Sequence, residues 1–230
     1  MLEFRSHMNV DLIDANVSDE MVAKAARVST GNDMSSEDNY QGLINFLMRE
    51  RHGSPFEHGV FTFRVEAPIF VWREHMRHRI ASYNEESGRY KELDSVFYVP
   101  DRARPLIQKG KTGSYHFVEG TSQDYYTTSL AIKAASEHAY MLYRRLIIQG
   151  IGKEVARMVL PLNIYSSGYV TINPRSLMNF LSLRTKRDNS SYPSYPQREI
   201  EMVAEQYEYF FEEFMPLTHA AFEDNGRVAP

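Results

Sequence analysis

The stretch from Arg73 to Lys91 concentrates side chains that could hold an anion. It reads REHMRHRIASYNEESGRYK, and most of its cationic residues are arginine. Arginine binds phosphate and carboxylate groups through two parallel hydrogen bonds. Ser82, Asn84 and Ser87 add uncharged hydrogen-bonding groups between the charges. We interpret the stretch as an anion-binding loop; the alternative is a solvated charged loop without a ligand.

Arg184 is the second candidate. Asn173, followed by proline, predicts the start of a helix. At about 100° per residue, Arg184 falls on the same face of this helix as Leu177 and Phe180. A guanidinium on an apolar face requires an anion or a carbonyl acceptor, because burying it alone is costly. The alternative is an arginine at the helix end that reaches back to water.

Other common site motifs are missing. His52, His58, His75 and His78, with Glu57, lack the tight spacing of metal ligands, so no metal site is expected. The chain contains no cysteine, which excludes disulfides, thiolate metal sites and cysteine nucleophiles. It also lacks a G-x-S-x-G elbow and a glycine-rich phosphate loop, so a bound nucleotide would be held by arginine side chains and backbone donors.

The composition is that of a globular protein. The 230 residues are 43% hydrophobic and 24% charged, with a formal net charge of -4, which disfavours nucleic-acid binding through a basic surface. We find no apolar run long enough to span a membrane and no signal peptide, and we expect a cytoplasmic protein. We expect one α/β domain over residues 9–222; residues 1–8 are expected to be a cloning remnant or a disordered N-terminus.

The elements that must position these residues follow from hydrophobic periodicity and capping signals. Strands are predicted at 10–13, 61–65, 96–99 and 165–172. Helices are predicted at 18–28, 36–52, 69–76, 122–149, 153–160, 173–184 and 197–214. The remaining long segments, 101–120 and 185–196, are predicted to be loops.

Taken together, the motifs make the chain resemble the flavin-dependent thymidylate synthases. The signature of that family, R-H-R followed after seven residues by S, stands here at residues 77–87. Three further motifs occur in the family's order, at residues 55–58 (PFEH), 156–161 (ARMVLP) and 173–184 (NPRSLMNFLSLR). The resemblance covers residues 9 to 222.

The resemblance implies a mixed sheet flanked by helices, assembled as a homotetramer with active sites shared between subunits. It implies FAD at the subunit interfaces and conversion of dUMP to dTMP, with methylenetetrahydrofolate as carbon donor and NADPH as reductant. The other, unrelated thymidylate synthases attack the uracil ring with a cysteine thiolate, which this chain lacks. Reduced flavin must then supply the hydride, while the protein supplies binding and electrostatics.

The family pattern also assigns residues. Those expected to bind dUMP are Arg77, Glu85, Ser87, Gly88, Arg89, Arg157 and Arg184. Those expected to line FAD are Ser54, Glu57, Arg77, His78, Arg79, Ile80, Asn173, Arg175, Asn179 and Leu183. The expected catalytic residues are Arg184, which would stabilise negative charge on the uracil, and His52, which would lie beside the flavin and the folate. Ser87 is expected to donate a hydrogen bond rather than to act as a nucleophile, because no positioned base is evident around it.

Two departures from the family pattern limit the assignment. Glu74 stands where the family often has a glutamine that contacts the nucleotide, and a carboxylate there would repel dUMP unless it were paired, so Glu74 is left unassigned. The loop 185–196 is longer than usual, so no folate contacts are assigned to it.

Two alternative functions remain. One is a non-catalytic flavin or nucleotide binder that kept the pockets. The other is an RNA-binding protein that uses the Arg-rich loop, which the net charge disfavours.

Overall fold

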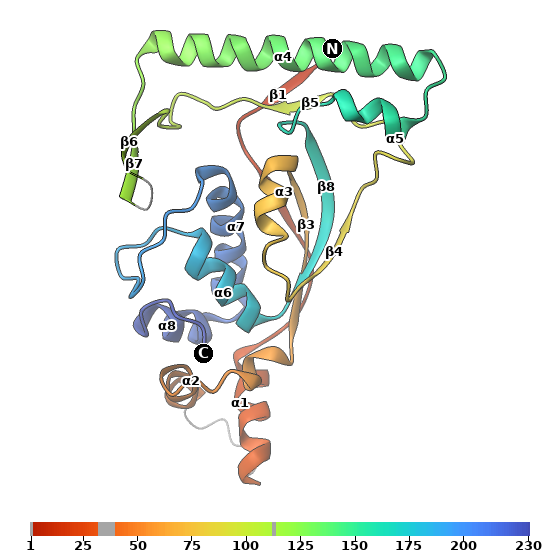
Figure 1. Ribbon diagram of the computed structural model, residues 1–230. Coiled ribbons are helices and arrows are strands. Elements are labelled where there is room, and N and C mark those ends of the chain that lie inside the picture. The colour runs from red at the N-terminus through yellow and green to blue at the C-terminus, as the bar shows by residue number, and fades with distance from the viewer. Residues whose placement is uncertain (1, 32–39, 112–113) are drawn as a thin grey trace. The chain divides into compact units, whose positions relative to one another are not determined.

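The computed structural model describes residues 2–31, 40–111 and 114–230 (Figure 1). The chain forms two compact units. The first comprises Met1–His7, Ala67–Trp72 and Glu85–Ser166, and the second comprises Met8–Glu66, Arg73–Asn84 and Ser167–Pro230. The predicted α/β class is confirmed, whereas the single domain stays a prediction.

The first unit is built around one long helix. A capping box starts α4 (Ser122–Ile148): Thr121 Oγ1 accepts from the Asp124 amide, and the Asp124 carboxylate accepts from the Thr121 amide. Leu93, Phe97 and Ile164 form a buried cluster. The other elements of the unit are β1 (Glu3–Arg5), β5 (Val96–Tyr98), β6 (Ile107–Lys111), β7 (Ser114–Val118), α5 (Lys153–Ala156) and η3 (Arg157–Val159).

Two segments of this unit were not predicted as strands. Residues 3–5, which the sequence placed outside the fold, form β1, paired in parallel with β5. Within the expected loop 101–120, β6 and β7 form an antiparallel pair. The side chains of β6 and of residues 115–118 of β7 are exposed or half-buried, so β6 and β7 lack the alternating apolar pattern that reveals a half-buried strand.

A four-stranded sheet with the order β2-β3-β8-β4 lies mostly in the second unit. Its strands are β2 (Asn9–Asn16), β3 (Val60–Pro68), β8 (Tyr165–Ile172) and β4 (Ser82–Glu85). The predicted alternation is confirmed in β3, where Phe61, Phe63 and Val65 are fully buried. The Phe63 ring lies 4.3 Å from the ring of Tyr207, so this sheet packs on a helix through aromatic contacts.

The second unit also contains most of the short helices. These are α1 (Asp19–Arg27), η1 (Val28–Thr30), α2 (Tyr40–Arg49), η2 (Ser54–Glu57), α6 (Pro174–Arg184), α7 (Arg198–Phe214) and α8 (Pro216–Asp224), while α3 (Ile69–His75) runs from the first unit into the second. The predicted start of α2 at residue 36 lies outside the described residues. The predicted cap of α6 is confirmed, since Asn173 Oδ1 accepts a 2.8 Å hydrogen bond from the Ser176 amide. None of the described helices is long and apolar enough to cross a membrane.

Candidate active site

Arg184 is half-buried and has the anionic partner that its position on α6 requires. Its side chain is 20% exposed. The guanidinium donates from Nη1 to Glu74 Oε2 at 2.9 Å, from Nη2 to the Glu74 carbonyl at 3.4 Å, and from Nε to His78 Nε2 at 3.0 Å. These acceptors are all supplied by the end of α3 and the turn that follows it. Glu74, left unassigned from the sequence, is therefore a paired carboxylate.

The protonation states of this group follow from burial. Burial, helped by the neighbouring Arg184 charge, lowers the pKa of His78 to about 4. A neutral His78 can accept the hydrogen bond from Arg184 Nε at its Nε2 atom, which places the ring's own hydrogen on Nδ1. Burial raises the pKa of Glu74; attraction to Arg184 opposes this shift, and repulsion by Glu199 adds to it. The Arg184 charge therefore favours the ionised form of Glu74.

A buried hydrogen-bonded network holds the turn that carries the R-H-R sequence. His75 is fully buried, with Nε2 at 2.8 Å from the Tyr207 hydroxyl and Nδ1 at 3.3 Å from the Tyr83 hydroxyl. The Tyr83 hydroxyl also donates to the His78 carbonyl at 2.7 Å. Burial lowers the pKa of His75 to about 3, with a further contribution from His78. His75 is thus a neutral structural residue that ties β4 and α7 to the R-H-R turn.

The buried neutral imidazole predicts a loss of stability in acid. The unfolded His75 protonates near pH 6.5, whereas the folded residue protonates only near pH 3. Between these values the unfolded state binds more protons, so this contribution to stability is complete above pH 6.5 and is lost as the pH falls toward 3. From pH 7 to pH 5 we expect a loss of about 2 kcal/mol, or roughly 4–8 °C in melting temperature. Scanning calorimetry should detect it.

The control is an exposed histidine. His75→Gln should remove this contribution and leave the similar one from His78, whose pKa is also lowered by burial, to about 4, whereas His116→Gln, in the exposed hairpin of β6 and β7, should leave both unchanged. Equal melting temperatures at pH 7 and pH 5 would contradict the burial of a neutral His75.

The predicted phosphate-binding residues of the first unit gather at one turn. Arg89 is exposed and pairs with Glu154 at 2.9 Å. Gly88 is buried, and a Cβ added to it would lie 3.2 Å from Cδ of Arg157. Ser87 Oγ accepts a 3.3 Å hydrogen bond from the Arg89 amide. The structure thus brings the Arg89 and Arg157 side chains to the same turn, where both could reach one anion.

The predicted flavin residues of the second unit form a second group. Arg175 pairs with Glu57, and its Nε donates to the backbone oxygen of Pro230 at 2.6 Å. Gly53 lies directly under this guanidinium, since a Cβ added there would overlap it. Asn179 is exposed and donates to the Arg175 carbonyl at 3.1 Å. The group presents a cation and an amide on the exposed side of α6.

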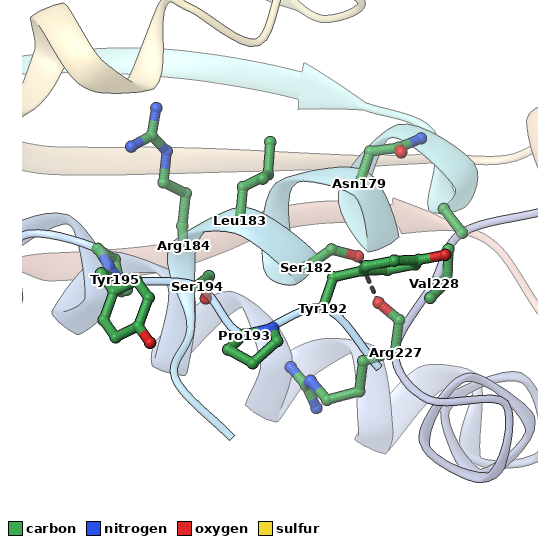
Figure 2. Close-up of a pocket in the computed structure, with 12 residues that line it drawn as sticks. Asn179, Ser182, Leu183, Arg184, Tyr192, Pro193, Ser194, Tyr195, Arg227 and Val228 are labelled. Carbon is green, nitrogen blue, oxygen red and sulfur yellow. Dashed lines mark hydrogen bonds between the residues drawn. The ribbon is translucent and has the colours of Figure 1, made fainter. Parts of the chain in front are cut away.

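A cleft of about 460 Å³ borders this side of α6 (Figure 2). Figure 2 shows Asn179, Leu183 and Arg184 projecting upward from the helix, with Arg227 below the helix and Val228 at the right of the view. The residues that line the cleft are Asn179, Ser182, Leu183, Arg184, Tyr192, Pro193, Ser194, Tyr195, Pro196, Arg227, Val228 and Ala229. The long loop 185–196 therefore forms one wall of a cleft that includes residues predicted for both flavin and dUMP.

The other predicted residues are mostly exposed. The Ile80 and Leu183 side chains are 74% and 58% exposed, which is high for apolar residues. His52 contacts the edge of Phe46, with ring centroids 5.8 Å apart. The exposed polar residues are Ser54, Arg77 and Arg79, while Glu85 is half-buried in the first unit. The predicted dUMP residues thus divide between the units, with Arg77 and Arg184 in the second and Glu85, Ser87, Gly88, Arg89 and Arg157 in the first.

Two ion-pair partners, Glu74 of Arg184 and Glu154 of Arg89, were not predicted from the sequence. The sequence indicated that Arg184 on an apolar face required an anion, but nothing in it linked Arg184 to Glu74, 110 residues away. Glu154 lies three residues before Arg157 in a short helix, but nothing in the sequence links it to Arg89, 65 residues away. Long-range ion pairs of this kind leave no periodic signal.

Comparison with known proteins identifies the family. The family model described as thymidylate synthase complementing protein matches residues 11–217. A flavin-dependent thymidylate synthase from Tropheryma whipplei is 59% identical over 99% of this chain and 97% of the relative. One from Streptomyces coelicolor is 52% identical over 100% of this chain and 96% of the relative.

A solved structure agrees with these matches. The UMP/dUMP methylase PolB from Streptomyces cacaoi, bound with 5-Br UMP, has a TM-score of 0.94 and 52% identity, over 100% of this chain and 99% of that chain. On the family match, the identities and the shared fold, the chain belongs to the flavin-dependent thymidylate synthases, a family of methyltransferases that act on dUMP.

Proposed function

We propose that the protein methylates dUMP reductively to dTMP in the cytoplasm, with methylenetetrahydrofolate as carbon donor and NADPH as reductant of bound FAD. The observation that carries the proposal is the hydrogen bonding of the Arg184 guanidinium. Among the described residues, three of its five N–H groups are engaged by Glu74 and His78. The other two are available to a ligand, on a guanidinium that its partners already hold in place.

The roles of the residues follow from their charges. Arg89 and Arg157 bind the phosphate of dUMP, helped by Ser87 and the backbone at Gly88, because a dianion is best held by charge-assisted donors. Arg184 binds the pyrimidine and stabilises the negative charge that develops on the ring as carbon five becomes nucleophilic. When bound, the reduced flavin supplies the hydride that completes the methyl group.

The residues predicted for FAD fit such a ligand. Arg77 and Arg79 are exposed cations next to the exposed Ile80, and Arg175 stands over Gly53. Phosphate groups suit the arginines, and a flat ring system would cover the exposed Ile80 and Leu183 side chains. Ser54, Glu57, His78, Asn173 and Asn179 complete the proposed set, and His52 acts beside the flavin and the folate.

An exposed apolar stripe supports a homotetramer. The sequence places Leu130 and Met141 on one apolar face of α4, and this face is exposed in the single chain. Tyr126 and Ile148, which extend the stripe by whole turns, are more than half exposed as well. A stripe of this kind normally packs against another helix, and a second copy of the chain would cover it.

If active sites are shared between subunits, two inactive variants should complement each other. Arg89→Ala removes a phosphate contact and Arg175→Ala removes a flavin contact, so a mixed tetramer can contain sites with neither change. Mixing the two after subunit exchange should restore part of the wild-type activity in a dTMP assay. Mixing each variant with itself is the control. A protein that sediments as a monomer and is fully active at low concentration would refute shared sites.

The direct test of function is product formation with each component omitted in turn. The purified protein with FAD, NADPH, methylenetetrahydrofolate and dUMP should yield dTMP, and omission of any one should abolish it. UMP should be assayed in parallel, because the similar PolB structures are described as those of a UMP/dUMP methylase, with 5-Br UMP or 5-Br dUMP bound. FAD binding without turnover of either nucleotide would instead support a non-catalytic binder.

A further inference from the structure

Two arginines adopt a backbone conformation that favours glycine. Among the described residues, those with positive φ that are not glycine are Arg51 and Arg227, at φ 63° and 58°. Each follows a helix, Arg51 after α2 and Arg227 after α8, at an end where left-handed glycine is the common residue. An L side chain is strained there, so its guanidinium must supply a compensating contact.

The position of Arg51 sets the position of His52. The Arg51 amide donates to the Met48 carbonyl at 3.3 Å, and the His52 amide donates to the Leu47 carbonyl at 2.9 Å. These two bonds form the Schellman pattern, in which the left-handed residue directs the next one back over the helix. The His52 ring accordingly meets the edge of Phe46. His52 is therefore held by the backbone conformation of Arg51.

The Arg51 side chain binds the C-terminal segment, residues 226–230. Its Nη1 donates to the Val228 carbonyl at 3.1 Å and to the Ala229 carbonyl at 2.9 Å. The next backbone oxygen, that of Pro230, accepts the 2.6 Å hydrogen bond from Arg175 Nε. The segment thus holds Arg51, which precedes His52, through two carbonyls, and it holds Arg175, which pairs with Glu57, through the Pro230 oxygen.

The segment is itself firmly anchored. The Arg227 guanidinium is buried and donates to Glu208 at 2.5 Å and to Thr185 Oγ1 at 2.8 Å, and it also pairs with Glu223. Ser182 of α6 donates to the Arg227 carbonyl at 2.6 Å, the bond that is dashed in Figure 2.

His219 lies near the carboxylates of Glu208 and Glu223. A histidine with two carboxylates could suggest a metal site. The charges of Arg227 and Arg187 already balance these carboxylates, so the cluster serves as the anchor of the segment.

We propose that residues 226–230 are a positioning element of the flavin site. Through the Val228 and Ala229 carbonyls the segment stabilises the left-handed conformation of Arg51, which fixes the position of His52. Through the Pro230 oxygen it orients the Arg175 side chain. This inference rests on the proposed function, because it takes His52 and Arg175 as flavin-site residues. In this proposal Arg51 acts through His52 and is a positioning residue.

The test removes the Arg51 guanidinium in two ways. Arg51→Met loses the contact and keeps the backbone strain, whereas Arg51→Gly loses the contact and gives the helix end its preferred residue. Arg64→Met is the matched control, because Arg64 is a half-exposed arginine paired with Glu66 away from the segment. FAD and dUMP dissociation constants, the visible spectrum of bound FAD and the melting temperature are measured on each full-length protein.

Arg51→Met should bind FAD at least tenfold more weakly and shift the spectrum of the bound flavin, whereas Arg51→Gly, which keeps the left-handed backbone without strain, should lose less FAD affinity. Their dUMP affinity should stay within twofold of wild type, and Arg51→Gly should melt no lower than Arg51→Met. Arg51→Lys should restore part of the FAD affinity, since an ammonium can reach one carbonyl. Wild-type FAD affinity and spectrum in Arg51→Met would overturn the inference alone. Failure of the wild-type protein to bind FAD would overturn the proposed function as well.

Discussion

Replacing Arg184 with methionine should lower the rate of dTMP formation roughly a hundred- to a thousandfold, because removal of one preorganised donor to a developing negative charge typically costs that much. Methionine keeps most of the aliphatic stem, so the packing of this end of α6 is preserved. Glu74 and His78 hold the guanidinium before any ligand arrives, so no reorganisation is needed when charge develops on the ring. The rate should be measured at saturating dUMP to separate it from binding.

A double variant, Arg184→Met with Glu74→Gln, separates the catalytic role of Arg184 from its contribution to stability. In Arg184→Met, Glu74 keeps its half-buried position without its cation, which should cost about 1–3 kcal/mol of folding stability. Burial already raises the Glu74 pKa, so the orphaned carboxyl shifts toward its neutral form. Adding Glu74→Gln removes the unpaired charge, and the melting temperature should recover while the rate does not. Recovery of the rate in the double variant would show that Arg184 serves only to balance Glu74.

The best predictions from sequence concern elements with a strong local pattern. In β3 the period-two alternation gave the buried face correctly, because a strand buried on one side shows its register in every second residue. In α6 the cap at Asn173 and the apolar face with Arg184 were both correct. The requirement that Arg184 find an anion was also correct, although the anion found within the chain is Glu74.

What the sequence did not reveal depends on contacts between distant segments. The pair Arg89–Glu154 and the hydrogen bonds from Arg51 to Val228 and Ala229 join residues far apart in the chain. No local propensity encodes these contacts. The left-handed arginine after α2 runs against local preference, which favours glycine there. Such violations of local rules are most informative once the structure shows what compensates for them.

Replacing Arg89 with alanine should raise the dUMP dissociation constant about thirty- to a hundredfold, on the order of 2–3 kcal/mol, because it removes a charge-assisted contact to the phosphate. Arg89 and Glu154 are both more than half exposed in their ion pair. Such a pair adds only about 0.2–1 kcal/mol to stability, so the variant should fold normally. The FAD dissociation constant should stay within twofold of wild type. Titration calorimetry can measure both ligands.

The Glu154 carboxylate supplies the matched control, because it competes with phosphate for the same guanidinium. Glu154→Gln should bind dUMP as tightly as wild type or more tightly, since Arg89 is then free of its intramolecular partner. Raising the salt concentration should weaken dUMP binding more in wild type than in Arg89→Ala, because the variant has one charge contact fewer to screen. An unchanged dUMP affinity in Arg89→Ala, or weaker binding in Glu154→Gln, would mean that the phosphate is held elsewhere and that Arg89 and Glu154 form only a surface ion pair.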